Sequence, residues 1–232
     1  PQRPEPDQAG QGVGDEEGSW GPSAFVRQHT FVFSGYKNDL PWGLRLSAMW
    51  RIQSGKPWGP EQSGDLNGDG VSFNDRPYIY RPSELPVFVS PSVTDAAVRD
   101  SVIGANRATY ADHLREFECV GDYQGQIIPR NTCRQPWFNS LDISLRKSFP
   151  TRDGQSAELQ IDLFNVLNGI NSDWGRNMDI RSSSRNLLSP QGYDPETGQI
   201  QYTVPSTFGR QSIVGTNLIQ QFTAQIGVRY RF

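Results

Sequence analysis

The sequence lacks any long apolar run. No stretch approaches the roughly 18 consecutive apolar residues of a transmembrane helix. Hydrophobic residues make up only 35% of the 232 residues, while Gly and Pro number 23 and 17, so the chain is poorer in apolar residues than a usual soluble domain. These deficits exclude a helical membrane span. They leave a transmembrane β-barrel open, because barrel strands carry an apolar residue only at every second position.

A strong charge of one sign and the common catalytic motifs are also missing. The formal net charge is −3 and no basic stretch interleaves with aromatic residues, so nucleic acid is not an expected partner. The chain holds no Gly-x-Ser-x-Gly, no His-Glu-x-x-His and no phosphate-binding glycine loop, and we predict no enzyme activity and no catalytic residue. We interpret Asp142, Glu158 and Asp162 as solvated charges paired across strands.

What is present is an alternation of apolar and polar residues. It recurs in five segments, each long enough to cross a bilayer as a tilted strand. In residues 44–53 all of the charge falls on one side of the expected strand. The predicted strands are 29–37, 44–53, 137–149, a strand that begins at Ala157, and 222–232.

Short and long connections alternate between these strands. Residues 38–43 and 150–154 carry the Pro, Gly and Asn of tight turns, whereas residues 58–135 and 169–217 are long. This alternation is typical of an outer-membrane barrel, in which short turns face the periplasm and long loops face outward. Residues 1–28 are then expected to be the flexible end of a preceding outer loop.

The predicted fold class is therefore all-β: an antiparallel transmembrane β-barrel fragment of about five C-terminal strands with long extracellular loops. Five strands cannot close a barrel, so we expect further strands upstream, and the start PQRPEP places any secretion signal upstream as well. A soluble antiparallel sandwich, which also alternates apolar with polar residues, stays open as an alternative.

Four motifs occur in order: Asn-Asp-Arg-Pro in the first long loop, Leu-Asp-Ile-Ser-Leu-Arg-Lys, Phe-Asn-Val-Leu-Asn, and an aromatic residue at the end. In this combination the chain resembles the last strands of TonB-dependent outer-membrane receptors, in the subgroup with a carboxypeptidase-regulatory-like N-terminal domain. The resemblance covers nearly all of residues 29–232.

The resemblance implies a place in the bacterial outer membrane, in contact with lipid, and import of a bulky nutrient such as an iron chelate, peptide or glycan. TonB would energise that import through an upstream plug that the sequence does not show. It also implies that the barrel-assembly machinery reads the last strand, and a free strand edge with an aromatic end is a physical template for strand addition. The residues of this assembly signal are Phe222, Ile226, Val228, Tyr230 and Phe232.

One loop segment has the opening of a calcium loop. Asp65, Asn67 and Asp69, followed by glycine, reproduce D-x-N-x-D-G, in which alternate side-chain oxygens converge on one cation. The twelfth position is Arg76 instead of Glu, although Asp75 beside it could take its place. Calcium is the only cofactor that the sequence suggests, and the alternative is a turn stabilised by its own Asx side chains.

The two cysteines, Cys119 and Cys133, both fall in the first long loop. In an oxidising exterior they are predicted to form one disulfide that closes the loop. The alternative is a metal pair, but the chain has only two histidines to complete a zinc site.

The loops also suggest helices and a binding surface. A helix is expected between Thr94 and Glu118, with Thr94 as its N-cap and a second short helix at 111–117. The aromatic residues that could face a ligand, or instead pack the loop itself, are Trp174, Tyr193, Tyr202 and Phe208.

The sequence thus predicts wall strands and outer loops of a receptor that imports an unknown nutrient. The alternative from another class is a surface adhesion or binding protein, calcium-dependent and sugar-binding, without transport. A further alternative is a soluble secreted sandwich.

Overall fold

A computed structural model describes residues 22–64, 75–213 and 220–232. The chain divides into two compact units, which are described separately. The sheet unit consists of Arg27–Lys56, Gln135–Asp179 and Ser212–Phe232. The loop unit consists of Pro1–Val26, Pro57–Arg134 and Ile180–Gln211.

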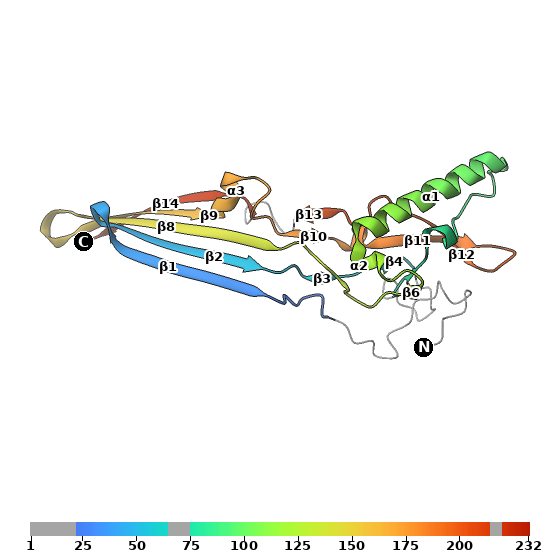
Figure 1. The fold of residues 1–232 in the computed structure, drawn as a ribbon. Coiled ribbons are helices and arrows are strands. Elements are labelled where there is room, and N and C mark those ends of the chain that lie inside the picture. Colours follow the sequence, from blue (N-terminus) through green and yellow to red (C-terminus); the bar gives the residue numbers. More distant parts are fainter. Residues whose placement is uncertain (1–21, 65–74, 214–219) are drawn as a thin grey trace. The chain divides into compact units, whose positions relative to one another are not determined.

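The sheet unit is built on one five-stranded antiparallel sheet in the order β1-β2-β8-β9-β14 (Figure 1). All five predicted strands are confirmed, with ends that shift by a few residues. The bounds are β1 Thr30–Leu40, β2 Leu44–Gln53, β8 Phe138–Pro150, β9 Ser156–Phe164 and β14 Thr223–Arg231. The sheet does not close on itself, since β1 and β14 are its two edges.

Tight turns close one end of the sheet. The 3-10 helix η2 (Pro41–Gly43) joins β1 to β2, and η4 (Arg152–Gly154) joins β8 to β9. Gly43 and Gly154 have positive φ of 70° and 80°, which glycine adopts without steric cost. The alternation of short and long connections is therefore confirmed, and we call this end of the sheet the turn end.

Both long connections leave from the opposite end, which we call the loop end. There the last residue of β2 is paired with the first of β8, and the last residue of β9 with the first of β14. The short helix α3 (Val166–Ile170) follows β9 directly. None of the described helices is long and apolar enough to cross a membrane.

The strand register sorts the side chains onto two faces. Leu46 is paired with Leu145, Leu145 with Ile161, and Ile161 with Ile226, so one apolar row crosses four strands. The adjacent residues point to the other face, because side chains alternate along a strand. On that polar face the central row is Ser47, Ser144, Asp162 and Gln225.

The apolar face is not covered. Among the described residues, every buried hydrophobic side chain belongs to the loop unit and none to the sheet. Large side chains such as Phe33, Trp50 and Val228 are exposed. A sheet in a soluble sandwich buries one face in a core, so this sheet does not have the packing of a sandwich.

The loop unit has a core of its own, which the sequence did not predict. Trp58 packs edge-on against Phe117, with 5.4 Å between ring centroids, and also contacts Phe208. Ile79, Leu114 and ten further residues complete the buried cluster, which contains residues from both long connections. The described parts of both long connections are thus folded structure.

The elements of the loop unit are short except for one helix. They are β3 Pro57–Trp58, β4 Glu61–Gln62, β5 Tyr78–Ile79, η3 Pro82–Glu84, α1 Ala96–Glu116, α2 Glu118–Gly121, β6 Gln126–Ile127, β7 Cys133–Arg134, η5 Ser182–Ser184, β11 Asn186–Tyr193 and β12 Ile200–Thr203. Two strands, β10 Met178–Ile180 and β13 Gln211–Ile213, have residues in both units.

The helix α1 corrects two predictions. Its N-cap is Asp95, not Thr94, because the Asp95 carboxylate accepts a hydrogen bond from the Val98 N–H at 3.1 Å. The expected second helix at 111–117 is the last turns of α1, which continues without a break to Glu116. Apart from the short helix α3, the all-β description holds for the sheet unit. It does not hold for the loop unit, whose largest element is this helix of 21 residues.

Candidate functional site

The polar face of the sheet is hollowed near its centre. A cavity of about 470 Å³ is lined mainly by small and polar side chains, and a second one of about 280 Å³ lies toward the loop end. Both cavities are lined by Asp142 and Phe164. Hydroxyl groups of Ser34, Ser47 and Ser140, together with Arg51, offer donors and acceptors to water or to a polar ligand.

The carboxylates of this face have structural partners. Glu158 forms an ion pair with Arg45. Asp142 accepts a hydrogen bond from the backbone N–H of Asn165 at 2.8 Å, and Asp162 accepts one from the Gln160 side chain at 2.6 Å. The predicted cross-strand pairing is thus present for Glu158, while the two aspartates are held by a backbone amide and a side-chain amide.

Two asparagines of the Phe-Asn-Val-Leu-Asn segment fasten the loop end of the sheet. Asn165 is buried and left-handed, with φ 50°, and its Nδ2 donates to the carbonyls of Gly175 and Gln220, both at 2.9 Å. The Oδ1 of Asn168 accepts the backbone N–H of Phe222 at 3.1 Å. The sequence identified this motif without a role, and the structure shows that it positions the start of β14.

Gly175→Ala is expected to disrupt the hydrogen bonds that Asn165 makes at the loop end of the sheet. A Cβ at Gly175 would lie 2.0 Å from the Asn165 Oδ1, and the φ of +65° is strained for alanine. We expect the free energy of unfolding to fall by about 1–3 kcal/mol and the Phe222 amide to exchange faster. Urea titration in detergent micelles and hydrogen exchange measure the two effects.

The matched control is Gly35→Ala, in β1 of the same sheet. A Cβ at Gly35 would meet nothing within 4 Å. Equal unfolding curves for both variants would show that the fastening does not stabilise the sheet.

The predicted assembly signal lies on the exposed edge strand. Ile226, Val228 and Tyr230 share the apolar face of β14, and Phe222 and Phe232 flank the strand. All five side chains are exposed. β14 pairs with β9 on one side only, so its other edge has the geometry of a strand-addition template. Recognition by the assembly machinery stays a prediction.

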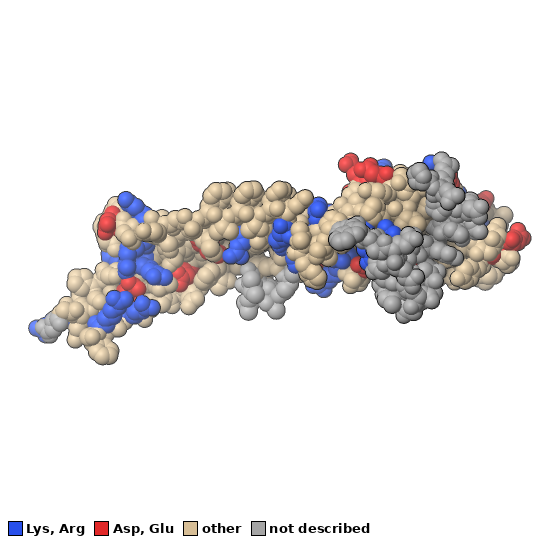
Figure 2. Space-filling view, turned by 90° about the horizontal axis from the view of Figure 1, so that it is seen from below, with Lys and Arg blue, Asp and Glu red and all other residues tan. Residues whose placement is uncertain are grey.

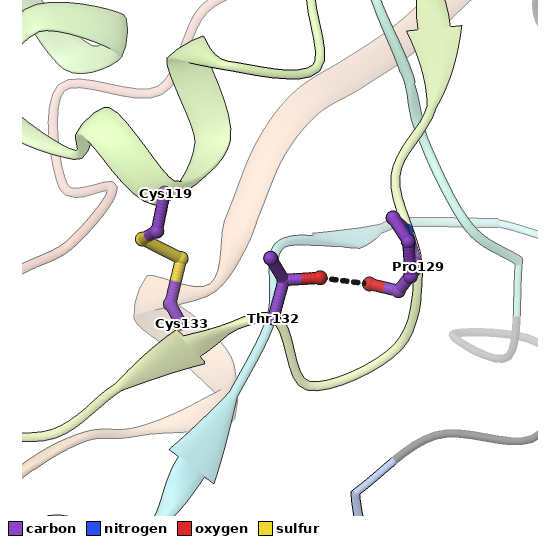
Figure 3. Close-up of a disulfide and its surroundings, with 4 residues drawn as sticks. All are labelled: Cys119, Pro129, Thr132 and Cys133. Carbon is purple, nitrogen blue, oxygen red and sulfur yellow. Dashed lines mark hydrogen bonds between the residues drawn. A yellow bond between two sulfur atoms is a disulfide. The ribbon is translucent and has the colours of Figure 1, made fainter.

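A disulfide joins Cys119 in α2 to Cys133 in β7, as the sequence predicted (Figure 3). The Cα atoms are 5.4 Å apart, and Cys133 lies in the core of the loop unit. Beside it the Thr132 hydroxyl donates to the Pro129 carbonyl at 2.7 Å. Within the part of the chain that the structure describes, no group of three or more His, Cys, Asp or Glu is arranged for a metal.

Replacing both cysteines by serine is expected to destabilise the loop unit by about 3 kcal/mol, because the bond closes a loop of 14 residues. Limited proteolysis should then cut the chain between α1 and β7 at lower protease concentration than in the wild type. A reductant should reproduce this effect in the wild type and leave the double variant unchanged. Equal resistance with and without the bond would contradict the prediction.

The calcium prediction falls mostly outside the described residues, where Asp65, Asn67 and Asp69 lie. Asp75 is described and is 2% exposed. It lines a cavity of about 90 Å³ together with Glu61, and the calcium site stays a prediction. Calorimetric titration should show calcium heat that Asp65→Ala abolishes, whereas no heat in the unaltered chain would remove the site.

The four aromatic residues predicted to face a ligand separate into two pairs. Trp174 and Tyr193 are 50% and 72% exposed, and their role in facing a ligand stays a prediction. Tyr202 and Phe208 are 0% and 4% exposed, so they do not face a ligand as predicted. They pack in the core of the loop unit, which is the alternative that the sequence left open. Burial also raises the pKa of the Tyr202 phenol above its ordinary value.

The comparison with known families shows the family to which the chain is similar. A family model described as "Outer membrane beta barrel domain" matches residues 6–212, which leaves β14 outside the match. No curated protein and no solved structure matches the chain.

Proposed function

The chain belongs to the outer membrane β-barrel domain family, which locates it in the bacterial outer membrane, and from this premise we propose that it is part of a TonB-dependent receptor. In this proposal the sheet unit supplies wall strands of a larger barrel and the loop unit supplies the outer, ligand-facing surface. The parent protein imports a bulky nutrient.

One observation carries the role as a barrel wall. The sheet has a continuous apolar face without a single buried hydrophobic side chain among the described residues, opposite a polar face of serines, aspartates and arginines. In a barrel wall, the apolar face meets hydrocarbon and the polar face meets water, so both faces are in a favourable environment.

Import and energisation rest on the resemblance described above. Its four motifs lie in the first long loop, β8, β9 with α3, and the end of β14. An elaborate folded outer surface also suits a receptor for a large ligand, because binding residues are often carried on loops held by a rigid scaffold.

Nutrient depletion by cells tests the proposal. Cells that carry the complete gene and cells that lack it are grown with mixed iron chelates, peptides and glycans, with and without a protonophore. We expect one class of compound to disappear from the medium only when the gene is present and the inner membrane is energised.

The same experiment tests the alternative of an adhesion or binding protein. Depletion that depends on the gene but is insensitive to the protonophore would indicate surface binding without transport. Purified TonB periplasmic domain that fails to bind the complete protein would also contradict the proposal.

A further inference from the structure

Four arginines gather on the polar face of the sheet near its turn end. They are Arg45 in β2, Arg146 in β8, and Arg229 and Arg231 in β14. We call these four residues the arginine patch. Figure 2 shows lysine and arginine side chains gathered toward the same end, the left-hand end in both views.

The strand register fixes the neighbours within the patch. Arg45 is the direct cross-strand partner of Arg146, and Arg229 is the direct partner of Glu158 in β9. Arg231 lies two residues beyond Arg229 and therefore on the same face. Glu158 is the only carboxylate in these rows of the sheet.

The positive charge of the patch is only partly compensated by Glu158. Glu158 is already engaged by Arg45. Arg146, Arg229 and Arg231 are exposed and form no hydrogen bond or ion pair with the described residues. Four cations against one carboxylate leave an excess of 4 − 1 = 3 positive charges.

This arrangement is unfavourable for the sheet by itself. Like charges directly opposite each other in an antiparallel pair destabilise it, as Arg45 and Arg146 do here. Arginine does not lose its proton in proteins, so the excess charge persists at any pH at which the cell lives. An anionic partner on the polar face would convert repulsion into charge-assisted hydrogen bonds.

The spacing of the patch indicates the form of the partner. It extends from β2 across β8 and β9 to β14, three strand spacings of about 4.8 Å each, or roughly 14 Å. A single phosphate or carboxylate cannot reach across that distance. An extended peptide rises about 3.3 Å per residue, so acidic residues at alternate positions recur about every 6.6 Å. Three such residues in a row therefore match the length of the patch.

We propose that the arginine patch is a docking surface for an acidic polypeptide segment that presents about three carboxylates across the polar face of the sheet. Lipid headgroups are not the occupant, because the patch lies opposite the apolar face. The inference needs the barrel fold but neither TonB nor transport.

Peptide binding to the complete protein in detergent micelles tests the docking surface. The probe is a fluorescent Glu-Ser-Glu-Ser-Glu peptide, and Gln-Ser-Gln-Ser-Gln is its neutral match. Fluorescence polarisation should show binding of the acidic peptide only, weaker at higher salt. Arg146→Gln with Arg229→Gln should raise its Kd at least tenfold.

The matched control is Lys147→Gln, which removes a positive charge next to Arg146 in β8 but on the opposite face of the sheet. It should change the Kd less than twofold. The proposal is overturned if both peptides bind alike, if the control loses as much affinity as the double variant, or if millimolar inorganic phosphate displaces the peptide completely.

Circular dichroism checks that each variant forms the sheet. If the double glutamine variant does not, Arg229→Lys replaces it, since lysine keeps the charge but not the planar fork that binds a carboxylate through two hydrogen bonds. A Kd raised threefold or more by Arg229→Lys supports docking, and an unchanged Kd contradicts it.

Discussion

Ala48→Arg is expected to prevent stable insertion of the sheet into a bilayer. Ala48 lies midway along β2 on the apolar face, between Gly35 and Ile143. A charged side chain near the bilayer midplane costs about 2–4 kcal/mol on the lipid side of a barrel. Urea unfolding of the complete protein in lipid vesicles measures the loss.

Ser47→Arg is the control for this prediction. Ser47 is the adjacent residue, similar in size, and its side chain belongs to the polar face. We expect it to insert as the wild type does. Equal losses for the two arginines would mean that the apolar face does not meet hydrocarbon.

Trp58→Ala is expected to unfold much of the loop unit while the sheet unit persists. Trp58 is 1% exposed and contacts Phe117 and Phe208 in the core. Replacing a buried tryptophan by alanine costs about 3–5 kcal/mol, because it removes apolar burial and leaves a cavity. Hydrogen exchange should show faster exchange in α1 and β11 and little change in β8 and β9.

An exposed tryptophan provides the comparison. Trp174→Ala removes the same side chain from a half-exposed position, and we expect the stability of both units to stay within about 0.5 kcal/mol of the wild type. Faster exchange throughout β8 and β9 in the Trp58 variant would contradict a separate core in the loop unit.

The strands could be predicted because their signal is local. The alternation in residues 44–53 requires no knowledge of any other strand, and β2 has those bounds. The disulfide could also be predicted, since Cys119 and Cys133 are the only cysteines in the chain. Turn residues such as Gly154 fixed the short connections in the same local way.

The loop unit and its core could not be predicted, because they depend on contacts between distant segments. Trp58 and Phe208 meet across the two long connections, and neither connection has a regular apolar period. Tyr202 looks like an exposed loop aromatic in the sequence, yet it is fully buried. The N-cap of α1 was misplaced by one residue, since Thr94 and Asp95 are both good caps and only backbone geometry separates them.

By itself, the sequence determined that this protein has strands with one apolar and one polar face, short turns at one end, long connections at the other, and one disulfide. Only the tertiary structure decided that the long connections form a compact unit with its own core, that Asn165 and Asn168 fasten β14, and that four arginines meet on one face. The physical reason is range: periodicity and turn chemistry act between neighbours in the chain, whereas packing and register join residues that are far apart in it.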